Sequence, residues 1–259
     1  MPPRPYILSE ATWDDVTSAS YEVAILPWGA TEAHNRHLPY GTDNIEAEAV
    51  AIRAAGEAWK QGARVVVLPS VPFGVQAGQR EIPLCLNMNP STQMAVIRDL
   101  LPALSMHGVR KLLILNGHGG NDFRQIIREL QPEAGLLLCQ ANWYSAVKPG
   151  PYFDEPGDHA GELETSVMQH VAPDLVRPLS TAGPGSARPF TIEALRDGSA
   201  WTPRHWIDVT DDTGVGNPAA ASAEKGKRFV AAVVAWLSDF LVELAAADPG
   251  RLHDVRSDA

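Results

Sequence analysis

Short runs that are apolar at every position divide the first part of the chain. These runs are residues 23–26, 65–68, 112–115 and 136–139. Uninterrupted apolar runs of this length are typical of parallel strands that are buried on both faces. Between them, apolar residues recur at helical spacing in residues 44–60, 91–106 and 123–130. The alternation predicts an α/β fold in which a mainly parallel sheet lies between two helical layers, a three-layer α/β/α sandwich.

The pattern becomes less regular after residue 145. Residues 149–157 are predicted to form a loop, residues 162–171 a short helix, and residues 183–216 an irregular segment with short strands around 201–209. Apolar residues at helical spacing between Phe229 and Leu244 predict a long C-terminal helix. Pro102 lies inside the helix predicted for residues 91–106, where it predicts a kink or a local break. No repeat or linker divides the chain, so residues 1–259 are predicted to be a single domain.

Charge and composition narrow the classes of partner. The net charge is −10 and no basic run occurs, which disfavours binding to nucleic acid or to an anionic membrane. The two cysteines, Cys85 and Cys139, form no CxxC pair, and the N-terminus lacks the apolar core of a signal peptide. No apolar run approaches the ~20 residues that span a bilayer. A cytoplasmic protein is therefore expected.

Polar residues with metal-binding chemistry gather after the predicted strands. Glu32, His34 and His37 follow the first strand, and Asp43 comes just before the next helix. The third strand leads into His118, Gly119, Gly120 and Asn121, and the fourth leads into Trp143. A further acidic segment begins the helix of residues 162–171 and contains Asp158, His159, Glu162 and Glu164. Open parallel sheets bind ligands beyond the carboxyl ends of their strands, so these residues are expected to share one site.

The residue types in this site favour a metal centre. Mixed imidazole and carboxylate ligands suit Zn, Mn or Fe(II), whereas a magnesium site would use oxygen alone. Glu32 and His34 could reach two different ions from an extended loop, or a turn could bring both to one ion. Asp43 is placed where a short carboxylate can bridge two cations, and His118 lies in a glycine-rich turn that allows close approach of the backbone.

Each motif has a simpler interpretation when it stands alone. The glycine-rich turn around His118 could hold a phosphate in a nest of backbone amides. The acidic segment could favour a helix start through the helix dipole, and His37 could be an ordinary loop histidine. A non-catalytic phosphate- or nucleotide-binding protein is thus the alternative of another class. The chain lacks a Walker loop or a dinucleotide fingerprint, and the coincidence of three polar clusters favours a shared metal site.

Three sequence blocks resemble the signature blocks of the creatininase (creatinine amidohydrolase) family, in order and in spacing. These blocks are residues 29–43, 116–121 and 159–166. The resemblance implies an α/β/α layered fold, a binuclear metal site, hydrolysis of a C–N bond in many members, and often a homohexamer. It also covers members that act on formamides, on a peptide or on inosose-type cyclic ketones, and the motifs do not choose among these substrates.

The resemblance also assigns roles to single residues. It implies that Glu32 and His118 bind one metal ion, that His34 binds the other, and that Asp43 bridges the two. His159 corresponds to a histidine proposed to shuttle protons. Apart from the resemblance, Asp158 is predicted to orient His159 because it is its neighbour in the chain. Trp143 corresponds to a residue of the substrate pocket. His37, Gly119 and Gly120 are also predicted to contact substrate, and Asn121 is predicted to support the ligands.

Two departures from the family pattern affect these assignments. Creatininase has a glutamate ligand where this chain has Gly120, and an apolar residue where this chain has Glu162. Since residues three apart share a helix face, Glu162 is predicted to lie beside His159 and to supply the missing carboxylate. Glu164 is the next candidate and is expected to support the site from outside. A tryptophan that closes over creatinine corresponds to about Glu155, which argues against creatinine as the substrate.

The expected activity is hydrolysis of an amide or cyclic amide of a small molecule by a metal-activated water. Two divalent ions would lower the pKa of the water and polarise the carbonyl, and His159 would give a proton to the leaving nitrogen. The alternative within the same site is hydrolysis of a C–C bond in a cyclic polyol ketone. The amide reaction alone would release an amine or ammonia.

Overall fold

The four apolar runs form one parallel sheet in the computed structural model, which describes residues 4–253. The strands are β1 (Val23–Trp28), β2 (Val65–Val67), β3 (Lys111–Asn116) and β4 (Leu137–Asn142). They lie in the order β2-β1-β3-β4, and every neighbouring pair is parallel. In register, Trp28 of β1 lies beside Asn116 of β3, which lies beside Asn142 of β4. The loops that follow these strands therefore leave the sheet at the same edge.

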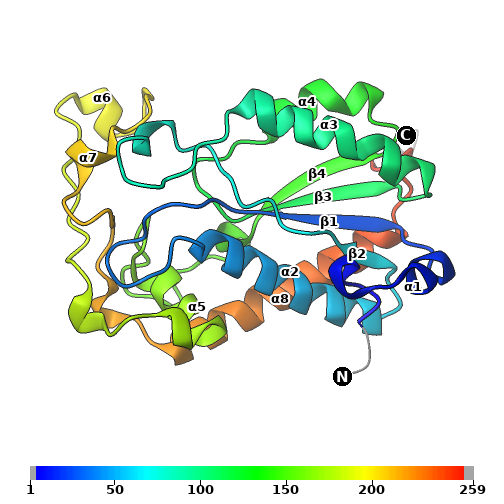
Figure 1. Ribbon diagram of the computed structural model, residues 1–259, viewed down its shortest axis with the longest axis horizontal. Helices are drawn as coiled ribbons and strands as arrows, with labels where there is room; N and C mark the ends of the chain where they lie inside the picture. Colours follow the sequence, from blue (N-terminus) through cyan, green and yellow to red (C-terminus); the bar gives the residue numbers. More distant parts are fainter. Residues whose placement is uncertain (1–3, 254–259) are drawn as a thin grey trace, which may run out of the picture.

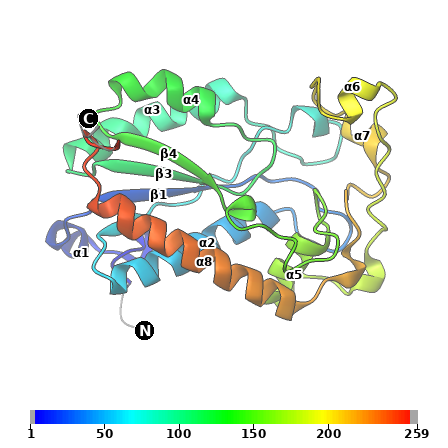
Figure 2. The same cartoon turned by 180° about the vertical axis from the view of Figure 1, so that it is seen from behind.

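Helices cover both faces of the sheet (Figures 1 and 2). One layer contains α2 (Thr42–Lys60), α5 (Glu162–Val171) and α8 (Ala223–Ala246), and the other contains α3 (Pro90–Met106) and α4 (Arg124–Leu130). Alternate residues of a strand point to opposite faces. Val23 and Ile25 accordingly pack in the core beneath α2 and α8, while Ala24 and Leu26 pack in the core beneath α3 and α4. The predicted three-layer α/β/α architecture is confirmed.

The remaining described elements are short. They are α1 (Trp13–Ser18), α6 (Glu193–Arg196), α7 (Trp206–Val209) and the 3-10 turns Leu8–Glu10, Ala77–Gln79, Gln131–Glu133, Trp143–Ser145, Pro173–Leu175, Leu179–Thr181 and Pro218–Ala220. The short strands expected around residues 201–209 are not found; α7 lies there instead. Trp206 is buried, and its indole nitrogen donates to the carbonyl of Thr213. This tertiary packing, which local sequence does not reveal, fixes the segment as a helical turn.

Two helices differ from expectation in informative ways. α3 continues through Pro102 to Met106 without the local break that was predicted as one outcome. Pro102 is exposed, so the carbonyl that loses its helical partner can be hydrated by water. α8 has 24 residues and a window of mean hydropathy 1.9, so the statement that no run approaches a membrane span was wrong. Its buried residues, including Phe229, Val233 and Leu237, pack in the core with α2, as expected of a core helix.

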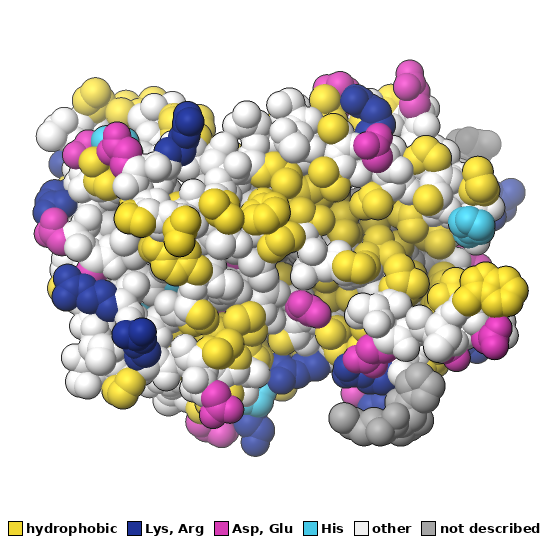
Figure 3. Space-filling view, in the orientation of Figure 1, with side chains coloured by type: hydrophobic (Ala, Val, Ile, Leu, Met, Phe, Trp, Pro, Cys, Tyr) yellow, Lys and Arg dark blue, Asp and Glu magenta, His cyan; other side chains and the backbone are white. Residues whose placement is uncertain are grey.

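Hydrophobic side chains gather on one exposed face of the protein. Figure 3 shows them on the face that carries α3 and the β2 edge of the sheet. Exposed large hydrophobic residues of the chain include Phe73, Leu84, Leu86 and Met106. Clustered apolar surface is typical of protein–protein contacts. The predicted homo-oligomer, a hexamer by family resemblance, remains a prediction.

Candidate metal centre

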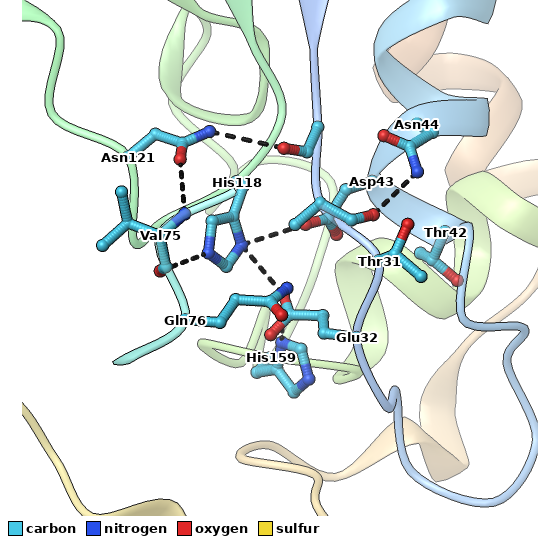
Figure 4. A network of polar contacts seen from close by, with 12 residues as sticks. Thr31, Glu32, Thr42, Asp43, Asn44, Val75, Gln76, His118, Asn121 and His159 are labelled. Carbon is cyan, nitrogen blue, oxygen red and sulfur yellow. Dashed lines mark hydrogen bonds and ion pairs between the residues drawn. The ribbon is translucent and has the colours of Figure 1, made fainter. Parts of the chain in front are cut away.

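Six ionisable side chains meet beyond the carboxyl ends of β1 and β3. They are Glu32, His34, Asp43, His118, His159 and Glu164. All belong to groups of three whose ligand atoms lie within 4.8 Å of one another. The loop after β1 supplies two of these side chains, the first turn of α2 supplies Asp43, and the turn after β3 supplies His118. Figure 4 shows His118, Glu32 and Asp43 pointing toward one another from these separate segments.

The first group consists of Glu32, Asp43 and His118. Nδ1 of His118 lies 2.8 Å from Oε1 of Glu32 and 3.0 Å from Oδ2 of Asp43. The other ring nitrogen, Nε2, lies 3.1 Å from the carbonyl oxygen of Val75. A carbonyl only accepts hydrogen bonds, so Nε2 carries a proton and donates it there. In the neutral ring, Nδ1 then presents its lone pair to the two carboxylates, which is the usual arrangement of a metal-binding histidine.

The second group consists of His34, Asp43 and Glu164. Nε2 of His34 lies 2.9 Å from Oδ1 of Asp43, and Nδ1 lies 3.1 Å from the carbonyl oxygen of Glu32. The backbone therefore fixes the tautomer of His34 as it does for His118. The two oxygens of Asp43 face different histidines, so this carboxylate joins the two groups. That is the geometry expected of a carboxylate that bridges two cations.

The charges in this cluster attract cations strongly. Burial opposes a charge on His34, but Asp43 outweighs it and raises the pKa of His34 to about 10. Burial also opposes a charge on His118, whose pKa is nevertheless raised well above its usual value by Glu32 and Asp43. Burial raises the pKa of Glu164. Each imidazole nitrogen that faces a carboxylate can therefore hold either a proton or a metal ion.

The donor set fits two borderline divalent cations. Each of these two groups offers one imidazole nitrogen and two carboxylates, and a third group of Glu32, His34 and His159 offers two imidazoles and one carboxylate. This ligand chemistry suits Zn or Mn. Five of the six residues are buried and Glu164 is partly buried, and shielding from water strengthens interactions with a cation. No cysteine joins the groups found among the described residues.

Glu162 does not lie in this cluster, and Glu164 takes the place expected for it. The Glu162 carboxylate accepts hydrogen bonds from Nζ of Lys225 and from the backbone N–H of Glu155, the latter at 2.8 Å. The prediction assumed that His159 and Glu162 share one helix. Instead α5 begins at Glu162, and Ala160 has a left-handed φ of +50°. The three-residue spacing therefore does not place the two side chains on the same face.

A polar network supports the ligands from outside. A side-chain N–H of Gln79 donates to Oε2 of Glu32, and the Cys85 thiol lies 3.5 Å from the amide oxygen of Gln79. Asn121 accepts from the backbone N–H of Val75 at 3.0 Å, which holds the segment that carries the partner of His118. Gln79 was not predicted as part of the site, because nothing in its local pattern places it beside Glu32. The supporting role expected for Asn121 agrees with its position.

Gly120 is required by the close packing of the turn after β3. A Cβ atom on Gly120 would lie 2.3 Å from the carbonyl oxygen of Val75 and 2.5 Å from Nε2 of His118. A Cβ atom on Gly119 would meet no atom within 4 Å. Gly120 therefore cannot carry a ligand in this chain without displacing His118.

This contrast gives a matched pair of variants. We expect Gly120→Ala to weaken metal binding by roughly 10- to 100-fold, the range for disturbing groups that hold a ligand in place. Gly119→Ala should bind metal as the unchanged protein does, because its side chain points into open space. Titration of both variants with Zn²⁺ would test this. Equal affinities would contradict the proposed role of the turn.

A cavity of about 600 Å³ opens onto the cluster. Its lining includes Gln76, Gly119, Gly120, Tyr144, Asp158 and Trp206. This volume is in the range of sites for small molecules. Gly119 and Gly120 line this cavity, and their contact with substrate stays a prediction. Tyr144 and Trp206 were not predicted, although aromatic residues in the loops beyond the strands were a usable signal.

Two residues that were predicted to contact substrate, Trp143 and His37, do not line the cavity. Trp143 is buried in the core, where its ring packs with that of Phe229 at a centroid distance of 6.3 Å, and the cavity is lined by Tyr144 instead. His37 is buried, and its Nε2 bonds to Oγ1 of Thr165 at 2.8 Å. Burial lowers the pKa of His37 to about 4, so it is a neutral structural residue and does not line the cavity.

Asp158 does not orient His159. Its carboxylate pairs with Arg204 at 2.6 Å on the wall of the cavity. Nε2 of His159 instead donates to the carbonyl oxygen of Ala33 at 2.8 Å. Nδ1 of His159 thus faces the cluster, 3.8 Å from Oε1 of Glu32. The backbone has taken the orienting role that was expected of Asp158.

Comparison with known proteins gives consistent matches over most of the chain. The family model described as creatininase, creatinine amidohydrolase, matches residues 9–241. The mycofactocin precursor peptide peptidase of Mycobacterium tuberculosis is 29% identical over 88% of this chain and 87% of its own length. The creatinine amidohydrolase of Pseudomonas putida is 26% identical over 65% of this chain and 73% of its own length.

Solved structures also match. A Bacteroides fragilis protein, with creatinine amidohydrolase as its assumed activity, is 45% identical with a TM-score of 0.90. That match covers 96% of this chain and 99% of the other. A creatininase variant complexed with creatine is 23% identical, with a TM-score of 0.75 over 94% of this chain and 100% of the other. The latter likeness shows a shared fold alone.

Proposed function

Because this chain belongs to the creatininase family, we propose that it is a binuclear metal-dependent amidohydrolase. The observation that carries the proposal is the position of Asp43, whose two carboxylate oxygens lie 2.9 Å and 3.0 Å from nitrogens of two different histidines. A single carboxylate between two ligand sets is the arrangement that two-metal hydrolases use. Creatininases of zinc and of manganese type are among the proteins of similar fold, which supports Zn or Mn as the ions.

Each ion would have its own ligands. Glu32 and His118 would hold one ion, His34 and Glu164 would hold the other, and Asp43 would bind both. When bound, the ions would polarise a substrate carbonyl and lower the pKa of a water molecule. The chain provides the rest of the site: Gln79 donates to one carboxylate oxygen of Glu32, which would leave the other oxygen for an ion, and the surrounding burial limits access of bulk water.

His159 is the residue placed to move a proton. Its Nε2–H is engaged by Ala33, so the free Nδ1 can accept a proton near the cluster and pass it to a leaving nitrogen. The ring is 7% exposed and stands 5.3 Å from the Trp206 ring in an edge-to-face arrangement. This packing limits the orientations of the imidazole and keeps Nδ1 toward the cavity.

Hydrolysis of a C–N bond is the chemistry that the comparisons support best. The relatives include a peptidase and a creatinine amidohydrolase, and both names denote cleavage of an amide-type bond. The substrate proposed here is a small amide or cyclic amide within the 600 Å³ cavity. Cleavage of a cyclic polyol ketone and non-catalytic phosphate binding are not favoured by the comparisons. The cytoplasmic location remains an expectation.

The experiment combines a product screen with a variant of His159. Zn- or Mn-loaded protein is incubated with lactams, formamides, short peptides and cyclic ketones, and amine release and loss of the ketone are measured separately. We expect His159→Ala to keep both ions and to lose roughly 10²–10⁴-fold in turnover, the range for a general acid or base. His107→Ala, at an exposed position at the end of α3, is the control and should keep full turnover.

Three results would count against parts of this proposal. Unchanged turnover of His159→Ala would remove the proton-transfer role. Loss of one metal ion from the same variant would make His159 a ligand, as its grouping with Glu32 and His34 also permits. If no amide in the screen is hydrolysed but cyclic ketones are, the proposed cleavage of a C–N bond is wrong and the enzyme cleaves a C–C bond.

A further inference from the structure

The side-chain amide of Gln76 has no hydrogen-bond partner among residues 4–253. Neither its oxygen nor its nitrogen is paired, although the residue is only 3% exposed. An amide shielded from water normally finds partners, because leaving its donor and acceptor unpaired is unfavourable. An unpaired amide in a ligand cavity is therefore a group that a ligand could satisfy.

Gln76 is firmly held at its backbone and lies on the wall of the cavity. Its backbone N–H donates to the side-chain oxygen of Asn87 at 2.8 Å. It directly follows Val75, whose carbonyl accepts from His118. Figure 4 shows the Gln76 side chain extending toward Glu32 and His159. The amide thus lies next to the proposed metal centre.

Neighbouring glutamines have different roles. Gln79 donates to Glu32 and lies beside the Cys85 thiol, and Gln93 donates to Asn121 at 2.8 Å. Both belong to the network that supports the metal ligands. Gln76 makes no such side-chain contact within the described residues, so support of the ligands does not explain its position.

We propose that Gln76 is a specificity-determining residue that recognises an N–H donor next to a C=O acceptor in the substrate. The inference rests on the proposed function and refines its substrate class. The Gln76 carboxamide has a C=O acceptor beside an N–H donor. A complementary ligand group places an N–H against that C=O and a C=O against that N–H. A cis-amide, as found in lactams and cyclic ureides, presents that pair on one edge. The side-chain rotamer of Gln76 adjusts as the ligand enters, which is common on binding.

This recognition excludes groups that lack the donor. A ketone or an ester satisfies the Gln76 N–H but leaves the amide oxygen without a partner. A carboxylate places a negative oxygen against that same amide oxygen. A site built to hydrogen-bond a substrate N–H discriminates against analogues without it, because the buried partner then stays unpaired. The carboxylate product of amide hydrolysis therefore fits less well than the substrate.

The test compares two probes that differ in the N–H group. Binding of 2-pyrrolidinone and of cyclopentanone to the Zn-loaded protein is measured by ligand-observed NMR. The ratio of the Kd of cyclopentanone to the Kd of 2-pyrrolidinone should fall by about 10-fold in Gln76→Leu, the factor that one or two neutral hydrogen bonds supply. Gln140→Leu is the matched control. Its amide oxygen is also unpaired, but it lies on β4 and outside the cavity, so the ratio should not change.

The outcomes separate this proposal from the proposed function. An unchanged ratio in Gln76→Leu would overturn the role of Gln76, even if amides are hydrolysed. A ratio that falls in Gln76→Leu would support it, and the same spectra show whether the lactam opens to an amino acid. Folding of the variants is checked independently through their metal content. Gln76→Leu is expected to bind as much metal as the unchanged protein.

Discussion

Asp43→Ala is expected to abolish metal binding at both positions and, with it, all hydrolysis. Asp43 places one oxygen toward His118 and the other toward His34, so its removal deprives both ligand groups of a carboxylate at once. Even residues that only support a metal ligand contribute 10- to 100-fold to affinity, so loss of a shared ligand should cost roughly 100-fold or more at each position. Metal content after dialysis, measured by elemental analysis, is the direct readout.

The control for this variant is Asp99→Ala. Asp99 is an exposed aspartate on α3, and its removal changes the net charge equally without touching the cluster. Full metal content should be retained there. If Asp43→Ala kept two ions under the same dialysis, the bridging role would have to be abandoned.

Replacing each of the two glutamates of α5 by glutamine in turn should show that they have different roles. Glu164→Gln is expected to lose the ion that His34 and Asp43 hold, and to reduce turnover to a trace. The carboxylate of Glu164 lies in that ligand group and also accepts the backbone N–H of Ala160. A neutral amide cannot replace the charge that a cation requires there.

Glu162→Gln is the matched variant two residues away on the same helix turn. Its carboxylate bonds to Lys225 of α8, so the substitution should lower the melting temperature and leave both ions in place. Loss of an ion from Glu162→Gln, with retention of both in Glu164→Gln, would reverse the assignment made from the structure.

The sequence was sufficient to predict the three α/β/α layers and the meeting of the polar clusters in one site. Residues 23–26 and 112–115 are apolar at every position because both faces of β1 and β3 are covered by helices. Once those strands are parallel, their carboxyl ends coincide, and the loops with Glu32 and His118 must meet. These inferences depend only on strand period and topology.

The choice between Glu162 and Glu164 depended on where one helix begins. The left-handed conformation of Ala160 and the pairing of residue 159 with Val215 end the irregular segment before α5, and neither is visible in local sequence. A one- or two-residue shift of a helix start changes which side chain faces the site. The helix was predicted at residues 162–171, where α5 lies, so the error was to extend its spacing back to His159, which lies before the helix.

Long-range packing determines which aromatic residues line the cavity and which are buried in the core. Trp143 and Tyr144 are adjacent in the 3-10 turn after β4, and the tryptophan is buried in a core cluster that includes Phe229 of α8. Trp206 reaches the cavity from a segment about 60 residues further along the chain. Their place in loops beyond the strands indicates that these aromatic residues can reach the site, but only tertiary packing selects which of them lines the cavity. The family resemblance implied Trp143, whereas Tyr144 lines the cavity.

The central claim is that Asp43 bridges two divalent cations, and a crystal structure with anomalous scattering tests it most directly. Protein is purified with Zn²⁺ or Mn²⁺, and data are collected on both sides of the metal absorption edge. We predict two anomalous peaks about 3.5 Å apart, the usual separation in such pairs. One peak should lie between Glu32 and His118, the other between His34 and Glu164, with an oxygen of Asp43 on each. A single peak, or two peaks of which only one contacts Asp43, would contradict the account.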